Sequence, residues 1–390
     1  MDLNALQFEF KKVFDETSEA TFFAPGRINL IGEHIDYNGG LVFPCAITLG
    51  TYGLISKRTD KLFRVYSSNF KELGTFEFSL DDLSYKPEHN WCNYIKGVLF
   101  YLKQAGYTIE TGLNLLVFGN IPNGSGLSSS ASLEMLMCKI FSDTYNLASL
   151  SPVKAALLGK EVENNYIGVN SGIMDQFAIA LGKEDSALLL NCNTQEYEYI
   201  PFKLDNYSIL IMNTNKRREL ADSKYNERRK ECDTALAILQ KTFDIDTLCQ
   251  LKDTQLEEAE ALLENPILFK RVKHAVAENT RVLMATEALK AGDLVTFGKL
   301  LNDSHRSLKE NYEVTGKELD TLAQNATLQK GVLGARMTGA GFGGCSLAIV
   351  ENSQIQDFIT NMSTIYEQTI GYAASFYIAS IGNGPIHLTH

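Results

Sequence analysis

The sequence predicts a mixed α/β (α+β) protein with two lobes, and three observations support this fold class. The chain has 390 residues, which is long for one domain and sufficient for two packed domains. Apolar residues make up 45% of it and charged residues 21%, so a sizeable core can form. Strand-like runs dominate residues 21–80, whereas residues 217–240 and 253–290 have the composition of helices. We expect the lobes to be residues 1–200 and 201–390.

Elements of the first lobe follow from local patterns. Leu133, Leu136, Met137, Ile140 and Phe141 recur at helical spacing, which predicts one buried helical face directly after a glycine-rich turn. Apolar spacing, glycine stops and β-branched residues predict the other elements. These are helices over 5–15, 90–106 and 151–168 and strands over 113–122 and 186–194.

The second lobe is expected to add strands over 207–215 and 375–382, besides its two helical regions. The stretch MTGAGFGGC, 337–345, places four glycines ahead of the apolar run SLAIV. It matches GxGxxG by letter, but a strand follows where a dinucleotide-binding fold needs a helix. A tight hairpin and a flexible loop that closes over a ligand both remain open interpretations.

Charge and cysteine content exclude several classes of protein. The net charge is −11, so nucleic acid and anionic membranes are poor partners. The seven cysteines are scattered without a CxxC motif, which favours reduced thiols over disulfides or a zinc site. No signal peptide or membrane-spanning run is recognisable. We expect a cytoplasmic protein that is a monomer, with a weak dimer as the alternative.

The stretch PGRINLIGEHIDYNGG, 25–40, gathers Arg27, Glu33, His34, Asp36 and Tyr37. A surface loop could carry these side chains without a function. A pocket for a polyhydroxylated ligand would need a similar set, because carboxylates and an imidazole pair well with hydroxyl groups.

The stretch PNGSGLSSSA, 122–131, is the strongest single signal, because a strand precedes it and an amphipathic helix follows. Glycines let the backbone approach a ligand, and the helix start directs free N–H groups at an anion. This arrangement suits a polyphosphate. A Gly/Ser linker or an ordinary helix cap is the alternative. The sequence contains no Walker A motif and no protein-kinase HRD or DFG signature.

The stretch NSGIMDQFAIALG, 170–182, places Asp175 among apolar neighbours. A helix cap or a buried structural aspartate would explain it. A desolvated carboxylate beside a ligand site could instead act as a catalytic base.

Together these stretches resemble the three-motif layout of the GHMP small-molecule kinases, and GRINLIGEHIDY is similar to the signature of the galactokinase family within them. The resemblance extends from Ala24 to about Ile378 and includes GIMDQ and SKYNERR. It implies a two-lobed fold, with an N-terminal lobe like ribosomal protein S5 domain 2, a ferredoxin-like C-terminal lobe, and the active site in the cleft between them. It also implies ATP-dependent phosphorylation of galactose at its anomeric hydroxyl, the first kinase step of galactose catabolism in the Leloir pathway.

The same resemblance assigns roles to individual residues. Galactose would contact Glu33, His34, Asp36, Gly172 and Tyr225. Asp175 would be the catalytic base, with Arg27 as its partner and the stabiliser of the transition state. The ATP-binding residues would be Ser67, Gly124, Ser125, Gly126, Leu127, Ser128, Ser129 and Ser130. Mg²⁺ would be held by Ser130 and Glu163. Two positions depart from the family pattern, namely Ile35 in place of Thr and Ala340 in place of Gly.

The paired charges constrain the mechanism. A free aspartate titrates near ~3.9 and bulk water near ~15.7, so complete deprotonation of the hydroxyl beforehand would cost about 16 kcal/mol. A neighbouring Arg27 would make Asp175 a weaker base still. We therefore expect late proton transfer, with the oxygen–phosphorus bond forming while the proton leaves.

Two rival functions fit parts of the sequence. An N-acetylgalactosamine kinase or another GHMP kinase would keep the fold and change the substrate. A catalytically silent sensor of galactose and ATP would keep the binding sites and lose the chemistry. The intact run from Ser128 to Ala131, together with Arg27 and Asp175, argues against the sensor.

Overall fold

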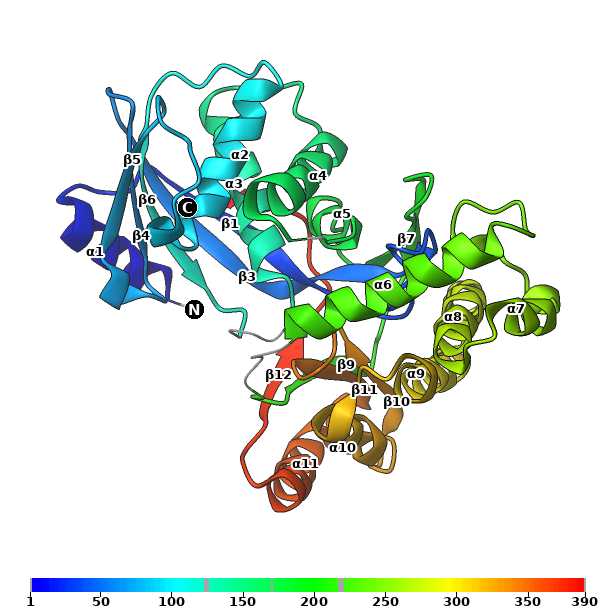
Figure 1. Cartoon of the computed structure of the whole chain (residues 1–390). Helices are drawn as coiled ribbons and strands as arrows, with labels where there is room; N and C mark the ends of the chain where they lie inside the picture. The colour runs from blue at the N-terminus through cyan, green and yellow to red at the C-terminus, as the bar shows by residue number, and fades with distance from the viewer. Residues whose placement is uncertain (1, 123–125, 170, 217–220, 389–390) are drawn as a thin grey trace.

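The structure is a computed structural model that describes residues 2–122, 126–169, 171–216 and 221–388. Figure 1 shows two lobes, one built on a six-stranded sheet and the other on a four-stranded sheet. This confirms the expected mixed α/β, two-lobed fold. Among the described residues no helix is both long enough and apolar enough to cross a bilayer.

The sheet of the first lobe has the strand order β13-β1-β3-β6-β4-β5, with β4 parallel to β6 and the other neighbours antiparallel. Its strands are β1 (Ala20–Asn29), β3 (Pro44–Lys57), β4 (Leu62–Ser67), β5 (Thr75–Ser79), β6 (Leu113–Gly119) and β13 (Ile386–Leu388). The last strand of the chain thus returns to the first lobe, where His387 pairs with Phe22.

Helices cover both faces of this sheet (Figure 1). On one face α1 (Leu3–Phe14) packs Phe10 and Phe14 against Leu54 and Leu116. The opposite face carries α2 (Cys92–Gln104) and α3 (Ser129–Thr144). Beside them lie α4 (Pro152–Glu161), a π-helix (Val162–Ile167) and α5 (Met174–Ala180), and α5 also contacts β1 and β3. The apolar face predicted from spacing in α3 is buried at all five positions, which confirms that prediction.

The sheet of the second lobe is fully antiparallel, in the order β10-β11-β9-β12. Its strands are β9 (Tyr207–Asn213), β10 (Val332–Thr338), β11 (Cys345–Glu351) and β12 (Ser375–Ala379). Helices separate β9 from β10 and β11 from β12, which is the ferredoxin-like β-α-β-β-α-β order. A small sheet of β2 (Leu41–Val42), β7 (Ser186–Asn191) and β8 (Tyr197–Pro201) lies beside the first lobe's motif loop.

The helices of the second lobe are α6 (Ala221–Leu239), α7 (Leu256–Leu263), α8 (Pro266–Lys290), α9 (Leu294–Ser307), α10 (Gly316–Ala326) and α11 (Ile355–Ile370). Residues 253–290, expected to be helical, form a short 3₁₀ turn followed by the two helices α7 and α8. Asn265 caps α8 by accepting from the backbone N–H groups of Ile267 and Leu268, and Pro266 occupies its first turn. An Asn-Pro pair ends one helix and begins the next because proline lacks an N–H donor.

The main hydrophobic core joins the two lobes. Ile28 and Ile31 of the first motif are fully buried in the same cluster as Met337 and Leu347 of the second lobe's sheet. The segment that carries the candidate ligand residues is therefore held between the lobes by apolar packing on both sides.

Candidate active site

The centre of the site is an ion pair between Arg27 of β1 and Asp175 of α5, which are 148 residues apart in the chain. The Nε of Arg27 donates to Oδ1 of Asp175, and a terminal nitrogen donates to Oδ2, both over 2.7 Å. The planar guanidinium thus holds both carboxylate oxygens. Arg27 is buried, whereas the Asp175 side chain keeps 29% of its surface exposed. The carboxylate is fixed in direction and still open to a ligand.

The glycine loop is fastened to this ion pair. The other terminal nitrogen of Arg27 donates to the carbonyl oxygen of Gly126 over 2.7 Å. The backbone N–H of Arg27 donates to the carbonyl oxygen of Leu127 over 3.3 Å. The Ser128 hydroxyl donates to Oδ2 of Asp175. Ser128 has a left-handed φ of 61°, a conformation found at strained functional positions. The side chain of Leu127 is buried in the hydrophobic core, so only its backbone can contribute to the site.

Helix α3 begins directly after this loop. Ser129 is its exposed first residue, and the Ser130 hydroxyl donates to Oε1 of Glu163 over 2.7 Å. Glu163 lies on the π-helix, and burial raises the pKa of its carboxyl group. Ser67 is buried at the end of β4, on the strand beside β6, which leads into the loop. Gly124 and Ser125 lie outside the described residues.

Glu33 of the first motif is held from the second lobe. Its Oε2 accepts from the terminal nitrogen of Arg336 over 2.9 Å, and its Oε1 accepts from the side-chain amide of Asn29 over 3.3 Å. Both members of the ion pair are buried, and burial raises the pKa of Glu33 although Arg336 and Arg27 oppose the shift. Glu33 can still accept from a ligand, since each carboxylate oxygen has two lone pairs.

His34 is part of a hydrogen-bond chain whose direction follows from chemistry. Its Nε2 lies 3.2 Å from the carbonyl oxygen of Ala340, which only accepts, so Nε2 carries the proton. Its Nδ1 then accepts from the hydroxyl of Tyr37 over 2.9 Å, and that hydroxyl accepts from Tyr312 over 2.9 Å. Burial lowers the pKa of His34 to about 3, so the ring is neutral. Both ring nitrogens are thus bonded to protein, with a left-handed φ of 62° at His34.

Asp36, Gly172 and Tyr225 complete the group. A Cβ atom on Gly172 would lie 1.7 Å from Oδ2 of Asp36, so only glycine fits there. Burial and the nearby Asp175 raise the pKa of Asp36 to about 6. Tyr225 comes from α6, and its ring centre lies 5.6 Å from that of His34. The structure therefore brings the predicted residues of the first motif, the glycine loop and the aspartate stretch into one place.

The glycine-rich stretch of the second lobe is a hairpin between β10 and β11 that also touches the site. Gly339 has φ +86°, and a Cβ on it would lie 2.9 Å from the carbonyl oxygen of Gly126. The two glycine loops therefore pack backbone against backbone. The hairpin interpretation is confirmed, and closure of this loop over a ligand stays a prediction.

Sequence reasoning missed three buried residues that support the site. Arg336 is fully buried and clamps the first motif. Glu134 of α3 accepts from the Gln176 side-chain amide over 3.1 Å, and both residues are fully buried. Burial and the neighbouring Glu163 raise the pKa of Glu134 well above its usual range. No local signal marks these residues, because each is defined by a partner far away in the chain.

Taken together, this arrangement offers a fixed and accessible carboxylate, a buried arginine, a helix N-terminus and a pair of oxygen ligands. It can accept a proton from a ligand hydroxyl and hold a negatively charged group beside it.

Comparison with protein families gives three matches along the chain. Residues 9–57 match the galactokinase galactose-binding signature, residues 93–183 match the GHMP kinases N-terminal domain, and residues 285–368 match the GHMP kinases C-terminal domain. A galactokinase from Clostridium perfringens is 60% identical over 388 residues, covering 100% of both chains. One from Enterococcus faecalis is 57% identical over 379 residues, covering 97% of this chain and 98% of the relative.

Solved structures agree with these relatives. The crystal structure of Lactococcus lactis galactokinase complexed with galactose superposes with a TM-score of 0.96 at 51% identity, covering 99% of this chain and 100% of that one. The Methanococcus jannaschii mevalonate kinase superposes with a TM-score of 0.68 at 20% identity, covering 93% of this chain and 98% of that one, which supports the fold alone.

Proposed function

The chain belongs to the galactokinase family of GHMP kinases, and on that premise we infer that it transfers the terminal phosphoryl group of ATP to galactose, giving galactose 1-phosphate and ADP. The observation that carries this function is the two-bond pair between Arg27 and Asp175, which lies beside the glycine loop with its carboxylate accessible.

In the proposed reaction Asp175 accepts the proton of the anomeric hydroxyl while the new oxygen–phosphorus bond forms and the bond to ADP breaks. Arg27 directs the carboxylate and stabilises the charge of the moving phosphoryl group. Because Arg27 and Ser128 already donate to Asp175, we propose that the carboxylate first orients the hydroxyl and receives its proton late.

The sugar pocket is proposed to consist of Glu33, His34, Asp36, Gly172 and Tyr225. Asp36 is the principal acceptor, because in the described part of the chain its carboxylate makes no hydrogen bond to another side chain. His34 has both nitrogens bonded to protein, so we assign it to shaping the pocket wall together with Tyr225. A pocket that pairs specific hydroxyls rejects an epimer, because unpaired buried groups cost about 1–3 kcal/mol each.

Galactose affinity should depend on pH through Asp36. Its pKa is raised to about 6, so the carboxylate is ionised above that pH and neutral below it. A neutral acid loses acceptor capacity, and at pH 5 we expect binding about tenfold weaker than at pH 7.5. The stability of the free enzyme depends on pH in the opposite direction. Because the folded-state pKa of Asp36 is raised, its contribution to the free energy of unfolding decreases as the pH rises from about 4 to 6.

Calorimetric titration with galactose between pH 5 and pH 8 measures this effect. Asp36→Asn should bind weakly at every pH and show no inflection near pH 6. Equal affinity of the unmodified enzyme at pH 5 and pH 7.5 would remove Asp36 from the role of principal acceptor.

ATP is proposed to place its phosphates along residues 124–130, at the N-terminus of the 16-residue helix α3, with Ser67 near the nucleotide. Ser130 and Glu163 would hold Mg²⁺, because their hydroxyl and carboxylate oxygens are 2.7 Å apart and are the hard oxygen donors that this ion prefers. A bound Mg²⁺ neutralises phosphate charge. No cluster of three or more acidic, histidine or cysteine metal ligands occurs in the described residues, which suits an ion held largely by water and phosphate.

Glu163→Gln should raise the Mg²⁺ concentration needed for half-maximal activity at least about tenfold, because a neutral amide is a poorer ligand for a hard cation. Titration of activity with Mg²⁺ at fixed ATP measures the shift. Glu161→Gln is the matched control, since Glu161 is exposed two residues away on the end of α4. Similar Mg²⁺ curves for the two variants would contradict the assignment.

We also propose a boundary between the lobes, an oligomeric state and a cellular location. We divide the lobes at residue 200/201, one residue before the end of β8, apart from the returning strand β13. We propose a monomeric enzyme in the cytoplasm, consistent with its free cysteines.

A substrate panel tests the function directly. The purified chain is incubated with ATP and Mg²⁺ and with galactose, N-acetylgalactosamine, homoserine or mevalonate. We expect galactose 1-phosphate and ADP in equal amounts from galactose alone. Faster turnover of another substrate would contradict the galactose assignment and would leave kinase activity supported.

A further inference from the structure

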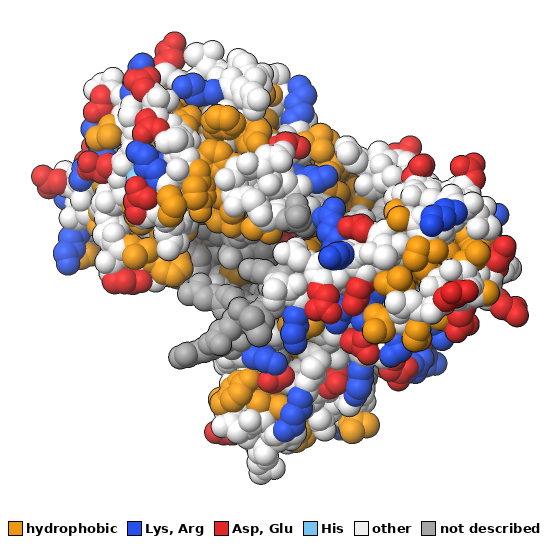
Figure 2. All heavy atoms as spheres, viewed as in Figure 1, with side chains coloured by type: hydrophobic (Ala, Val, Ile, Leu, Met, Phe, Trp, Pro, Cys, Tyr) orange, Lys and Arg blue, Asp and Glu red, His pale blue; other side chains and the backbone are white. Residues whose placement is uncertain are grey.

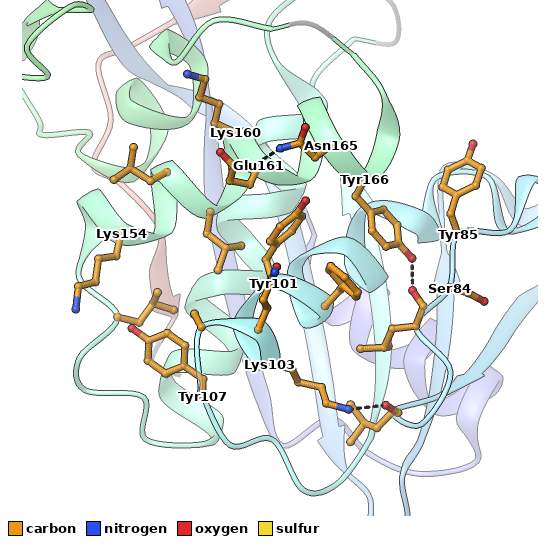
Figure 3. Close-up of a pocket in the computed structure, with 18 of the residues that line it drawn as sticks. Ser84, Tyr85, Tyr101, Lys103, Tyr107, Lys154, Lys160, Glu161, Asn165 and Tyr166 are labelled. Atoms are coloured by element: carbon orange, nitrogen blue, oxygen red, sulfur yellow. Dashed lines mark hydrogen bonds between the residues drawn. The ribbon is translucent and has the colours of Figure 1, made fainter.

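A cavity of about 1900 Å³ lies in the first lobe (Figure 3), and neither Arg27 nor Asp175 lines it. Its walls are the segment 80–85 on one side and α2 and α4 on the other, and the π-helix adds Asn165 and Tyr166. We call this cavity the α2–α4 groove. None of the residues assigned to galactose, ATP or Mg²⁺ lines it.

One wall of the groove is aromatic. The ring centre of Tyr166 lies 6.0 Å from that of Tyr85 and 5.8 Å from that of Phe100. Tyr85 is 49% exposed and Phe100 is 42% exposed, although both are large apolar side chains. Figure 2 shows hydrophobic side chains gathered on the surface over α2 and α4. Exposed rings that adjoin one another mark a binding surface, since isolated ones are scattered over any protein.

Three lysines surround the remainder of the groove: Lys103, Lys154 and Lys160 (Figure 3). Lys103 donates to the carbonyl oxygen of Leu80 over 3.0 Å, and Lys154 donates to that of Ser149 over 3.1 Å. Each ammonium group keeps further N–H donors. None of the three forms an ion pair with a carboxylate of the described residues. Three carboxylates, Asp81, Asp82 and Glu161, also line the groove and partly offset this positive charge.

The acceptors in the groove are already bonded. Asp81 pairs with Lys61 over 2.9 Å, and Asp82 pairs with Lys86 over 2.8 Å. Glu161 accepts from the Asn165 amide over 2.5 Å. A ligand with acceptor oxygens and a planar ring could accept from the lysine ammonium groups and stack against the aromatic wall.

We propose that the α2–α4 groove is a second ligand site for an aromatic anion of the nucleotide class. The base stacks against Tyr85, Phe100 and Tyr166, and the phosphate oxygens accept from lysine ammonium groups at the rim of the groove. The volume exceeds the roughly 300–1,000 Å³ of most small-ligand sites, so a nucleoside polyphosphate fits without closure of the groove.

Equilibrium dialysis with ADP, in the presence of Mg²⁺ and with the full chain, tests the proposal. We expect two ADP molecules per chain, one of them in the active site. The variant Lys154→Glu/Lys160→Glu should lower affinity at the second site at least tenfold and leave the KM for ATP within twofold. Its matched control, Lys241→Glu/Lys330→Glu, makes the same charge change at exposed lysines outside the groove and should keep both sites.

A second variant distinguishes the contribution of the base to affinity from that of the phosphates. Tyr85→Ala/Phe100→Ala should weaken ADP at the second site at least tenfold and leave pyrophosphate binding there unchanged. Unchanged kcat in both groove variants would show that they fold. A single ADP site in the unmodified chain overturns the proposal. Equal affinity of the second site for pyrophosphate and ADP would also overturn it, because the base would then contribute nothing.

Discussion

Replacing Asp175 by asparagine should lower kcat by about 10²- to 10⁴-fold, the usual contribution of a positioned general base. The amide keeps the size of the carboxylate and can still accept one hydrogen bond from Arg27. It cannot take up the proton of the anomeric hydroxyl. Galactose affinity, measured by calorimetry without ATP, should stay within about threefold, so the loss appears in turnover.

Two comparisons sharpen this result. Ser128→Ala removes one donor to Asp175 and leaves the two-bond contact with Arg27, so its kcat should fall by less than about tenfold. Asp36→Asn should instead weaken galactose binding. Near-normal turnover of Asp175→Asn would exclude the proton-acceptor role. The site would then promote phosphoryl transfer only by positioning the two substrates.

Local elements were predictable because their signals are contained in a few consecutive residues. The strand, glycine turn and amphipathic helix around residues 113–144 occur as the pattern predicted, since apolar spacing and glycine placement act within one element. The Asn265-Pro266 pair was equally local, and its helix boundary could have been read from the sequence.

The rest depends on partners that are distant in the chain. The three-residue strand β13 is too short to show periodicity, and it forms only because β1 offers an edge. Arg336 has no local signature, since its contacts reach back about 300 residues to Leu30 and Glu33. The pairing of Arg27 with Asp175 was anticipated from family resemblance, because no spacing rule brings residues 148 apart together.

Replacing Arg336 by methionine should have the largest effect on stability, lowering the free energy of unfolding by about 3–5 kcal/mol. Arg336 is fully buried, and one terminal nitrogen donates to the carbonyl oxygens of Asn29 and Leu30 over 2.9 Å each. The other donates to Glu33 over 2.9 Å. Methionine fills part of the volume, but it leaves a buried carboxyl group without its cation and the carbonyl oxygen of Leu30 without its donor, while that of Asn29 keeps the Thr338 hydroxyl.

Arg306→Met is the matched control, because Arg306 is 65% exposed and pairs with Asp303 over 2.7 Å. An exposed pair contributes at most about 1 kcal/mol, so this variant should unfold close to the unmodified temperature in calorimetry. The double variant Glu33→Gln/Arg336→Met removes the unpaired charge and should lose less stability than the sum of the two single variants. Equal melting temperatures for Arg336→Met and Arg306→Met would show that the clamp between the lobes contributes little. A lower melting temperature for Arg336→Met alone would show that the contacts of Arg336 with Asn29, Leu30 and Glu33 stabilise the junction of the lobes.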